Sequence, residues 1–408
     1  MIEISSLVNS LSPSQTLAMS QKSAELRAQG VDVINLSVGE PDFNTPAHIK
    51  EAAKRAIDEN YTRYTPVAGY KELREAIASD MRRHPGVDFT ADDIVVSNGA
   101  KQSLCNAILA TVNPGDEVII PAPAWVSYSE MVKLAHGVSV IVESGIEDDF
   151  KMTPEKLEKA ITPKTRMLLL TSPSNPTGSV YTRAELQDLV DVLARHERVL
   201  VLARHERVLV LADEIYEHIN FTGSFTSMAE FPELKGRVII INGVSKAYAM
   251  TGWRIGFMAA PRELAKACTK LQSQYTSNPS SIAQKAAEAA YTGPQDCVTE
   301  MNKAFERRRD LVVELARTVP GWEVNVPMGA FYLLPRVTGC LGTTAPDGRR
   351  IETSGDLALY LLEKAAVATV DGAAFAAPGY LRLSYATSDD NLREAFRRIG
   401  EAVAALKR

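Results

Sequence analysis

The chain has 408 residues, which suits one large domain and a smaller second one. Its formal net charge of −5, without a dense block of Lys and Arg, argues against a protein that binds nucleic acid. The four cysteines lie far apart and the six histidines show no metal-ligand spacing, which argues against a disulfide framework and a structural zinc site. Because no apolar run reaches membrane-spanning length and the N-terminus shows no signal-peptide pattern, we expect a cytoplasmic protein without a membrane partner.

Short apolar runs alternate with helical patterns along most of the chain. The runs expected to form strands are residues 93–99, 117–123, 166–173, 208–215 and 237–243. Apolar runs separated by helices are typical of a mostly parallel sheet between helices, so the α/β class is predicted. After about residue 295, long helical patterns surround further apolar runs at 329–335 and 380–387. We therefore expect a large domain at 47–295 and a smaller α+β domain at 296–408, to which residues 1–46 contribute a segment.

Small and polar residues follow the ends of the predicted strands. They occur at residues 98–101, 174–178, 213–216 and 245–246. In open α/β sheets, ligands bind in the crevice beyond the carboxyl ends of the strands. The sequence therefore predicts one site to which several strand ends contribute.

Lys246 lies among small residues at one of these strand ends. Most lysines are solvated surface residues, but an amine in a partly dry pocket can form a Schiff base, as pyridoxal phosphate chemistry requires. Asp213 ends an otherwise apolar strand, where its charge would be costly unless a cation such as a pyridinium nitrogen faced it. A helix that opens at Gly99 presents free backbone N–H groups to an anion, and Ser245 and Arg254 are further phosphate donors. The combination predicts a site for pyridoxal phosphate.

Six motifs of the chain, taken in sequence order, resemble those of the fold-type I pyridoxal-phosphate-dependent aminotransferases, specifically the bacterial aspartate and aspartate/prephenate aminotransferases. The resemblance covers nearly the whole chain and is carried by LSVGEPDFNTP (36–46), YTPVAGYKELREAI (64–77), SPSNPTG (172–178), DEIYEH (213–218), SKAYAMTGWRIG (245–256) and RLSYATS (382–388). It implies a homodimer with shared active sites. It also implies transfer of the amino group of L-aspartate to 2-oxoglutarate by a ping-pong mechanism through an aldimine at Lys246.

The resemblance assigns roles around the cofactor ring. Lys246 would hold the cofactor and move the proton between the substrate α-carbon and C4′, while Asp213 would keep the ring nitrogen protonated. Tyr216 and Asn175 would hydrogen-bond the ring oxygen, and Trp125 would stack on the ring. Asn175 and Trp125 would also contact the substrate. The residues implied to bind the phosphate side of the cofactor are Gly99, Ala100, Lys101, Ser245, Arg254 and, from the neighbouring subunit, Tyr64.

The resemblance also assigns a substrate site. Arg382 would bind the α-carboxylate as a bidentate fork, with the Gly39 backbone closing over the same group. Lys101, with Ser14 and Thr16, would bind the distal carboxylate of a dicarboxylic substrate. The alternative for Lys101 is that it balances the phosphate charge or lies on a solvated helix face.

Several alternatives to aspartate transamination remain open at this point. Prephenate-using relatives resemble one another in a basic residue before Pro13, where this chain has Ser12, and position 124, often tyrosine, is Ala124. These departures favour aspartate over prephenate or a broader specificity. A C–S lyase would not need the distal-carboxylate site, and an effector domain of a transcription regulator would need a DNA-binding segment ahead of the fold.

A nine-residue segment, VLARHERVL, occurs twice in tandem within residues 192–210. Removing one copy leaves a run that resembles the family without a gap, so we interpret the repeat as an insertion into a complete fold. Either the preceding helix continues through it, or two apolar runs compete for one strand. Only the second run leads directly into Asp213, so cofactor binding should select it. A further alternative is a chain that folds without binding cofactor.

Overall fold

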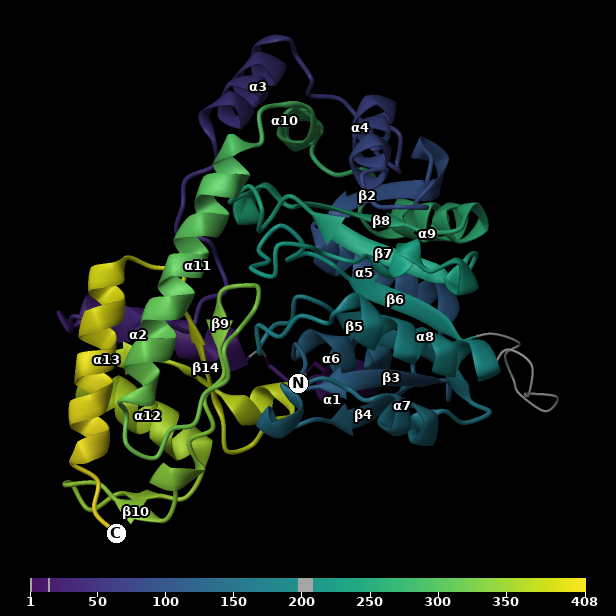
Figure 1. The fold of residues 1–408 in the computed structure, drawn as a ribbon. Helices are drawn as coiled ribbons and strands as arrows, with labels where there is room; N and C mark the ends of the chain where they lie inside the picture. Colours follow the sequence, from purple (N-terminus) through teal and green to yellow (C-terminus); the bar gives the residue numbers. More distant parts are fainter. Residues whose placement is uncertain (1, 14, 197–207) are drawn as a thin grey trace.

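The computed structural model describes residues 2–13, 15–196 and 208–408, and a seven-stranded sheet forms the centre of its larger part (Figure 1). The strand order is β2-β8-β7-β6-β5-β3-β4, and all neighbours are parallel except that β8 is antiparallel to β2 and β7. The strands are β2 (Ile94–Asn98), β3 (Glu117–Ala122), β4 (Val138–Glu143), β5 (Thr165–Thr171), β6 (Leu209–Asp213), β7 (Val238–Gly243) and β8 (Ile255–Ala259).

The predicted α/β class is confirmed, and five of these strands coincide with the predicted runs. β4 and β8 lie outside them. β4 is a partly exposed edge strand, so it lacks the continuous apolar character of a central strand. β8 follows the motif that contains Lys246 and pairs with both β2 and β7.

Helices cover both faces of the sheet because successive side chains of a strand point to opposite faces. Val118 and Ile120 of β3 belong to one buried cluster and Ile119 belongs to another. The first cluster includes side chains of α5 (Ala100–Thr111), α6 (Ser127–Leu134) and α9 (Arg262–Tyr275). The second includes side chains of α3 (Ala47–Asp58), α4 (Lys71–Met81), α7 (Pro154–Ala160), α8 (Arg183–His196) and α10 (Ser281–Thr292).

The C-terminal part of the chain builds a second, separate core beside the sheet (Figure 1). Its helices are α11 (Asp296–Arg317), α12 (Ser354–Ala365) and α13 (Asp389–Ala404). Its strands are β9 (Tyr332–Leu333), β10 (Thr343–Thr344), β11 (Arg350–Ile351), β12 (Val367–Ala368), β13 (Val370–Asp371) and β14 (Leu381–Ser384). The sheet order β13-β14-β9 places β14, which carries Arg382, in the middle.

The N-terminal segment contacts this second core. It contains α1 (Ser6–Ser10), α2 (Gln15–Ala28) and β1 (Ile34–Asn35), and β1 pairs in parallel with β12. The domain limits expected at residues 46 and 295 remain a prediction that this pairing supports. No helix within the described ranges combines the length and apolar character that a bilayer crossing requires.

The tandem repeat starts within the last turns of α8 and ends at the first residue of β6. The buried stripe Leu186, Leu189, Val190 and Leu193 belongs to α8, which the structure describes up to His196. β6 starts at Leu209, the last residue of the second copy, so the prediction that the second run forms the strand is confirmed. The path expected for the first run, residues 199–203, lies outside the described residues. Asp213 stands at the opposite end of β6 from Leu209, the residue at which the second copy ends.

Candidate active site

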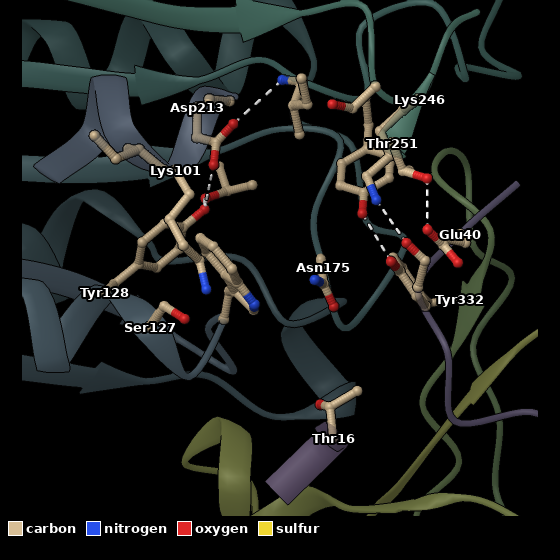
Figure 2. A pocket seen from close by; sticks show the side chains of 18 of the residues that line it. Thr16, Glu40, Lys101, Ser127, Tyr128, Asn175, Asp213, Lys246, Thr251 and Tyr332 are labelled. Carbon is tan, nitrogen blue, oxygen red and sulfur yellow. Dashed lines mark hydrogen bonds between the residues drawn. The ribbon is translucent and has the colours of Figure 1, made fainter. Parts of the chain in front are cut away.

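A cavity of about 420 Å³ lies where the carboxyl ends of β5, β6 and β7 face the smaller core. Figure 2 shows Asp213, Tyr128 and Lys101 on one side of it and Lys246, Glu40 and Tyr332 on the other, with Asn175 between them. The predicted residues that line this cavity are Thr16, Gly39, Ala100, Lys101, Trp125, Asn175, Asp213, Tyr216, Ser245, Lys246, Arg254 and Arg382. Residues up to 366 positions apart in the sequence thus meet in one space, as the strand-end argument predicts.

The amine of Lys246 points into this cavity. Its Nζ donates a hydrogen bond to the carbonyl oxygen of Gly39 at 2.5 Å, and it lies 5.7 Å from the ring centroid of Tyr216. Burial of the amine lowers the pKa of Lys246 to about 8, while the nearby carboxylate of Glu40 acts in the opposite direction. The amine of Lys246 is therefore neutral to a larger extent than that of an ordinary lysine, and the neutral amine is the nucleophilic form.

Asp213, the last residue of β6, is 4% exposed and is held by two donors. The Tyr128 hydroxyl donates to Oδ2 at 2.7 Å, and the backbone N–H of Ile215 donates to Oδ1 at 3.3 Å. Burial raises the pKa of Asp213 to about 6, and the bond from Tyr128 opposes this rise. A buried carboxylate with a fixed orientation is suited to face a cationic ring nitrogen.

Tyr128 is a site residue that the sequence did not predict. It is buried in the first turn of α6, and its hydroxyl also lies 2.6 Å from Oγ1 of Thr171 at the end of β5. It stands three residues after Trp125, but that spacing does not indicate a partner 85 positions away. Tyr332, whose hydroxyl lies 2.7 Å from that of Tyr216, was missed for the same reason.

Arg382 lines the cavity and is 2% exposed. Its Nη1 donates to Oδ1 of Asn175 at 3.1 Å and its Nη2 donates to the carbonyl oxygen of Ser37 at 2.5 Å. The rings of Tyr332 and Phe375 enclose the guanidinium group at 4.7 and 4.8 Å. Its Nε has no hydrogen-bond partner among the described residues. A buried cation without a carboxylate partner fits an anionic ligand.

Next to Asp213 and Lys246, the start of α5 forms a cradle with positive character. Gly99 has φ +82°, and a Cβ at this position would collide with the guanidinium group of Arg254. Arg254 is held by the carbonyl oxygens of Thr251 at 2.9 Å and Asn98 at 3.3 Å. The positive φ therefore favours glycine at this position, and the N-terminal turn of α5, which favours an anion, lies beside an arginine.

Lys101 lies at the edge of the cavity, with Nζ 4.6 Å from the ring centroid of Trp125. Partial burial, followed by repulsion from Arg254, lowers the pKa of Lys101, although its side chain still reaches solvent. Thr16 lines the same cavity, whereas Ser14 lies outside the described residues. Tyr64 is 92% exposed and does not line the cavity of its own chain.

The comparisons with known proteins agree with this geometry. Residues 31–399 match the family described as aminotransferase class I and II, and the chain belongs to this family. It is 50% identical to the aspartate/prephenate aminotransferase of Cereibacter sphaeroides (strain ATCC 17029 / ATH 2.4.9), over 97% of each chain. Its structure matches that of the aspartate aminotransferase from Rhizobium meliloti with a TM-score of 0.94 and 45% identity, over 100% of both chains. It matches the Thermus thermophilus aspartate aminotransferase with maleate at a TM-score of 0.90 and 42% identity, over 98% of this chain and 100% of that one.

The family, the fold and the pyridoxal phosphate cofactor predicted from the sequence are therefore confirmed. The residues present fit this cofactor. Lys246 supplies the amine, Asp213 a buried carboxylate, and the start of α5 with Arg254 a positive cradle suited to the phosphate. The individual residue roles assigned from the sequence remain predictions.

Replacing Tyr128 with phenylalanine should lower kcat/KM by roughly 10–100-fold, because Asp213 would lose a charge-assisted hydrogen bond. The cofactor dissociation constant should rise in parallel, measured by absorbance titration of the cofactor-free protein. The matched control is Tyr181→Phe: this buried hydroxyl accepts from the backbone N–H of Met152 at 2.7 Å and does not line the cavity. The control should lose thermal stability and keep its activity; an active Tyr128→Phe variant with normal cofactor affinity would contradict the assigned role.

Proposed function

We propose that the chain transfers the amino group of L-aspartate to 2-oxoglutarate in two half-reactions. The observation that carries the proposal is that two cations, Arg382 inside and Lys101 at the edge, line one cavity, as binding of a dicarboxylic substrate requires. Relatives named aspartate aminotransferase support it.

In this proposal Arg382 binds the α-carboxylate and Lys101 binds the distal one, which orients the substrate α-carbon toward Lys246. Bound pyridoxal phosphate supplies the electron sink that stabilises a carbanion at that carbon. The neutral amine of Lys246 takes the α-proton and later returns it. Asp213 pairs with the ring nitrogen as a buried carboxylate, held in place by Tyr128.

Prephenate is the second candidate substrate, because the relative from Cereibacter sphaeroides is named aspartate/prephenate aminotransferase. In this chain the backbone N–H of Ser12 donates to Glu130 of α6 at 3.0 Å, and Ser12 brings no cation to the N-terminal segment. We therefore propose 2-oxoglutarate as the preferred oxo-acid substrate and prephenate as the second candidate. The initial rates of the aspartate-loaded enzyme with each oxo acid would decide the order.

We also propose that the working unit is a homodimer. The 92% exposed Tyr64 is then the residue that reaches the phosphate side of the neighbouring subunit. The cytoplasmic location remains a prediction from the sequence.

An absorbance spectrum before and after addition of L-aspartate, without any oxo acid, tests the first half-reaction directly. Loss of the visible band of lysine-bound cofactor would support the proposal. A band that is present and does not change would leave the cofactor site in place and exclude aspartate as donor.

Replacing Lys101 with alanine tests the substrate assignment. We expect kcat/KM for L-aspartate to fall roughly 10–100-fold, because a charged hydrogen bond to the distal carboxylate is lost, while kcat/KM for L-alanine, which has no such group, changes little. Lys101→Arg, which keeps the charge, should retain part of the activity on aspartate. Equal losses of kcat/KM on both amino acids would instead indicate that Lys101 balances the charge of the cofactor phosphate.

A further inference from the structure

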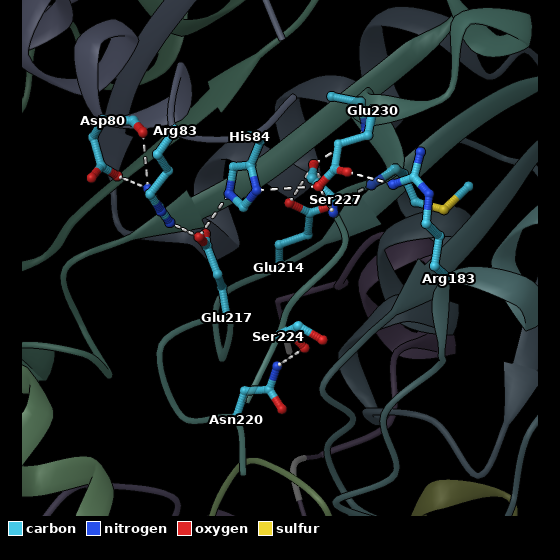
Figure 3. A network of polar contacts seen from close by, with 12 residues as sticks. Asp80, Arg83, His84, Arg183, Glu214, Glu217, Asn220, Ser224, Ser227 and Glu230 are labelled. Atoms are coloured by element: carbon cyan, nitrogen blue, oxygen red, sulfur yellow. Dashed lines mark hydrogen bonds and ion pairs between the residues drawn. The ribbon is translucent and has the colours of Figure 1, made fainter. Parts of the chain in front are cut away.

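Glu214 and Glu217, which belong to the same turn as Asp213 and Tyr216, lie in a polar cluster (Figure 3). We call the side chains Arg83, His84, Glu214, Glu217, Ser227, Glu230 and Asn242 the rear cluster. Asp213 and Tyr216 line the cavity, whereas Glu214 and Glu217, which alternate with them along the turn, are buried at the rear and do not line it. Within residues 213–217, Asp213 and Tyr216 thus face the cavity, whereas Glu214 and Glu217 face the rear cluster.

Glu217 is 8% exposed and receives donors from two other parts of the fold. Asn242 of β7 donates Nδ2–H to Oε2 at 2.7 Å. Beyond the end of α4, the ring Nε2 of His84 lies 3.0 Å from Oε1, and the guanidinium group of Arg83 is in close contact with the same oxygen. The carboxylate of Glu217 therefore joins the turn to β7 and to the segment after α4.

His84 itself is held between two carboxylates. Its Nε2 faces Glu217, and its Nδ1 lies 3.3 Å from Oε1 of Glu230, which is also paired with Arg183 at 2.6 Å. The ring packs edge-on against Phe225 with the centroids 5.7 Å apart. The imidazole is thus fixed on both sides, and through it so is the position of the Glu217 carboxylate.

Glu214 anchors the other end of the turn. Its carboxyl oxygens accept from the backbone N–H of Met228 and the hydroxyl of Ser227, both at 2.9 Å. The backbone N–H of Glu214 donates to the carbonyl oxygen of Ile241 at 2.9 Å, which ties this end to the sheet. At the far end of the turn, next to Tyr216, the backbone N–H of Glu217 donates to the carbonyl oxygen of Glu214 at 2.9 Å, and the Glu217 side chain supplies the contacts with β7 and the segment after α4.

We propose that Glu217, with His84 behind it, is a positioning residue that sets the place of the Tyr216 hydroxyl at the cofactor ring. Buried ion pairs contribute little net stability compared with apolar packing, so their position directly beside a site residue favours a role in orientation. The inference rests on the proposed function only in taking Tyr216 as a ligand of the cofactor ring oxygen.

A double-mutant cycle on the holoenzyme tests the proposal, because coupled residues give non-additive effects. Glu217→Gln, which keeps the side-chain volume, should lower kcat/KM roughly tenfold, within the range that coupled neighbours show. In a Tyr216→Phe background the same substitution should have no further effect. Equal losses in both backgrounds would overturn the proposal and leave Glu217 a structural role.

A second readout does not depend on turnover or on the amino acid used. A donor to the anionic ring oxygen favours the deprotonated form, so its displacement should raise the pH midpoint at which the absorbance of lysine-bound cofactor changes. Glu217→Gln should shift this midpoint upward, in the same direction as Tyr216→Phe and by less. An unchanged midpoint with a lowered unfolding temperature would contradict positioning. A wild-type protein that binds cofactor but does not react with aspartate would contradict the proposed function and leave this test intact.

His84→Asn covers the case in which Glu217→Gln does not fold. It removes the imidazole and leaves the bonds from Asn242 and Arg83 to Glu217. The midpoint should move in the same direction by a smaller amount. A folded His84→Asn variant with a wild-type midpoint would remove His84 from the proposal.

Discussion

Replacing Lys246 with alanine should lower kcat by more than about 10⁴-fold, the upper end of what general acid–base assistance alone contributes. The variant would lose the proton-transferring amine and also the atom that bonds to the cofactor. The structure gives the physical reason: this amine lies in the cavity, where burial lowers its pKa to about 8 and the carbonyl oxygen of Gly39 orients it.

Borohydride reduction followed by intact-mass measurement checks the covalent part separately, since it makes an imine bond permanent. Wild type should retain the cofactor mass, and Lys246→Ala should not. Lys270→Ala, an exposed lysine of α9, is the matched control and should behave as wild type in both assays. Substantial turnover by Lys246→Ala would mean that another group transfers the proton.

Replacing Asp213 with asparagine should lower kcat roughly 10²–10⁴-fold, because removing one partner of a buried charge pair costs about 3–5 kcal/mol. The amide keeps the shape of the side chain but has no charge with which to keep the ring nitrogen protonated. Both donors to the carboxylate, Tyr128 and the backbone of Ile215, remain in place, so a large rearrangement is not required.

The control for this substitution is Asp116→Asn. Asp116 is 0% exposed and accepts from the backbone N–H of Asn113 at 2.8 Å, but it precedes the first residue of β3, at the opposite end of that strand from its carboxyl end, and does not line the cavity. It should lower the unfolding temperature and leave kcat unchanged. A similar loss of kcat in both variants would mean that removing any buried carboxylate charge lowers activity, and it would contradict the role of Asp213 at the ring nitrogen.

The sequence was most informative for residues whose chemical groups occur at a recognisable position in a local pattern, such as the end of an apolar run. Lys246, Asp213 and Asn175 each follow an apolar run, and the rule that ligands bind beyond strand ends brings them together without knowledge of the strand order. Arg382 was assigned through the family resemblance, and its place in an apolar strand agrees with that role because a buried arginine needs an anionic partner. The tandem repeat could also be interpreted from the sequence: only the second apolar run, residues 208–212, leads directly into Asp213, and β6 starts at Leu209 within that run.

Residues whose importance depends on a distant partner were not predictable. Tyr128 is marked only by its bond to Asp213, 85 positions away, and His84 by its contact with Glu217, 133 positions away. Neither pairing leaves a periodic signal, because both depend on which elements become neighbours in space. Tyr64 remains a prediction because its role requires a second subunit.

The sequence by itself predicted the α/β class and the pyridoxal phosphate site, because hydrophobic period and strand-end position are local properties, and the family resemblance named the side chains to which we assign the chemistry. Tertiary structure alone decided how these side chains are held. The order of β5, β6 and β7 places Thr171, Asp213 and Asn242 on adjacent strands, and the packing of α6 and of the segment after α4 brings Tyr128 and His84 to that turn. The physical reason is that a buried carboxylate must be met by donors, and which donors reach it depends on packing between segments far apart in the chain.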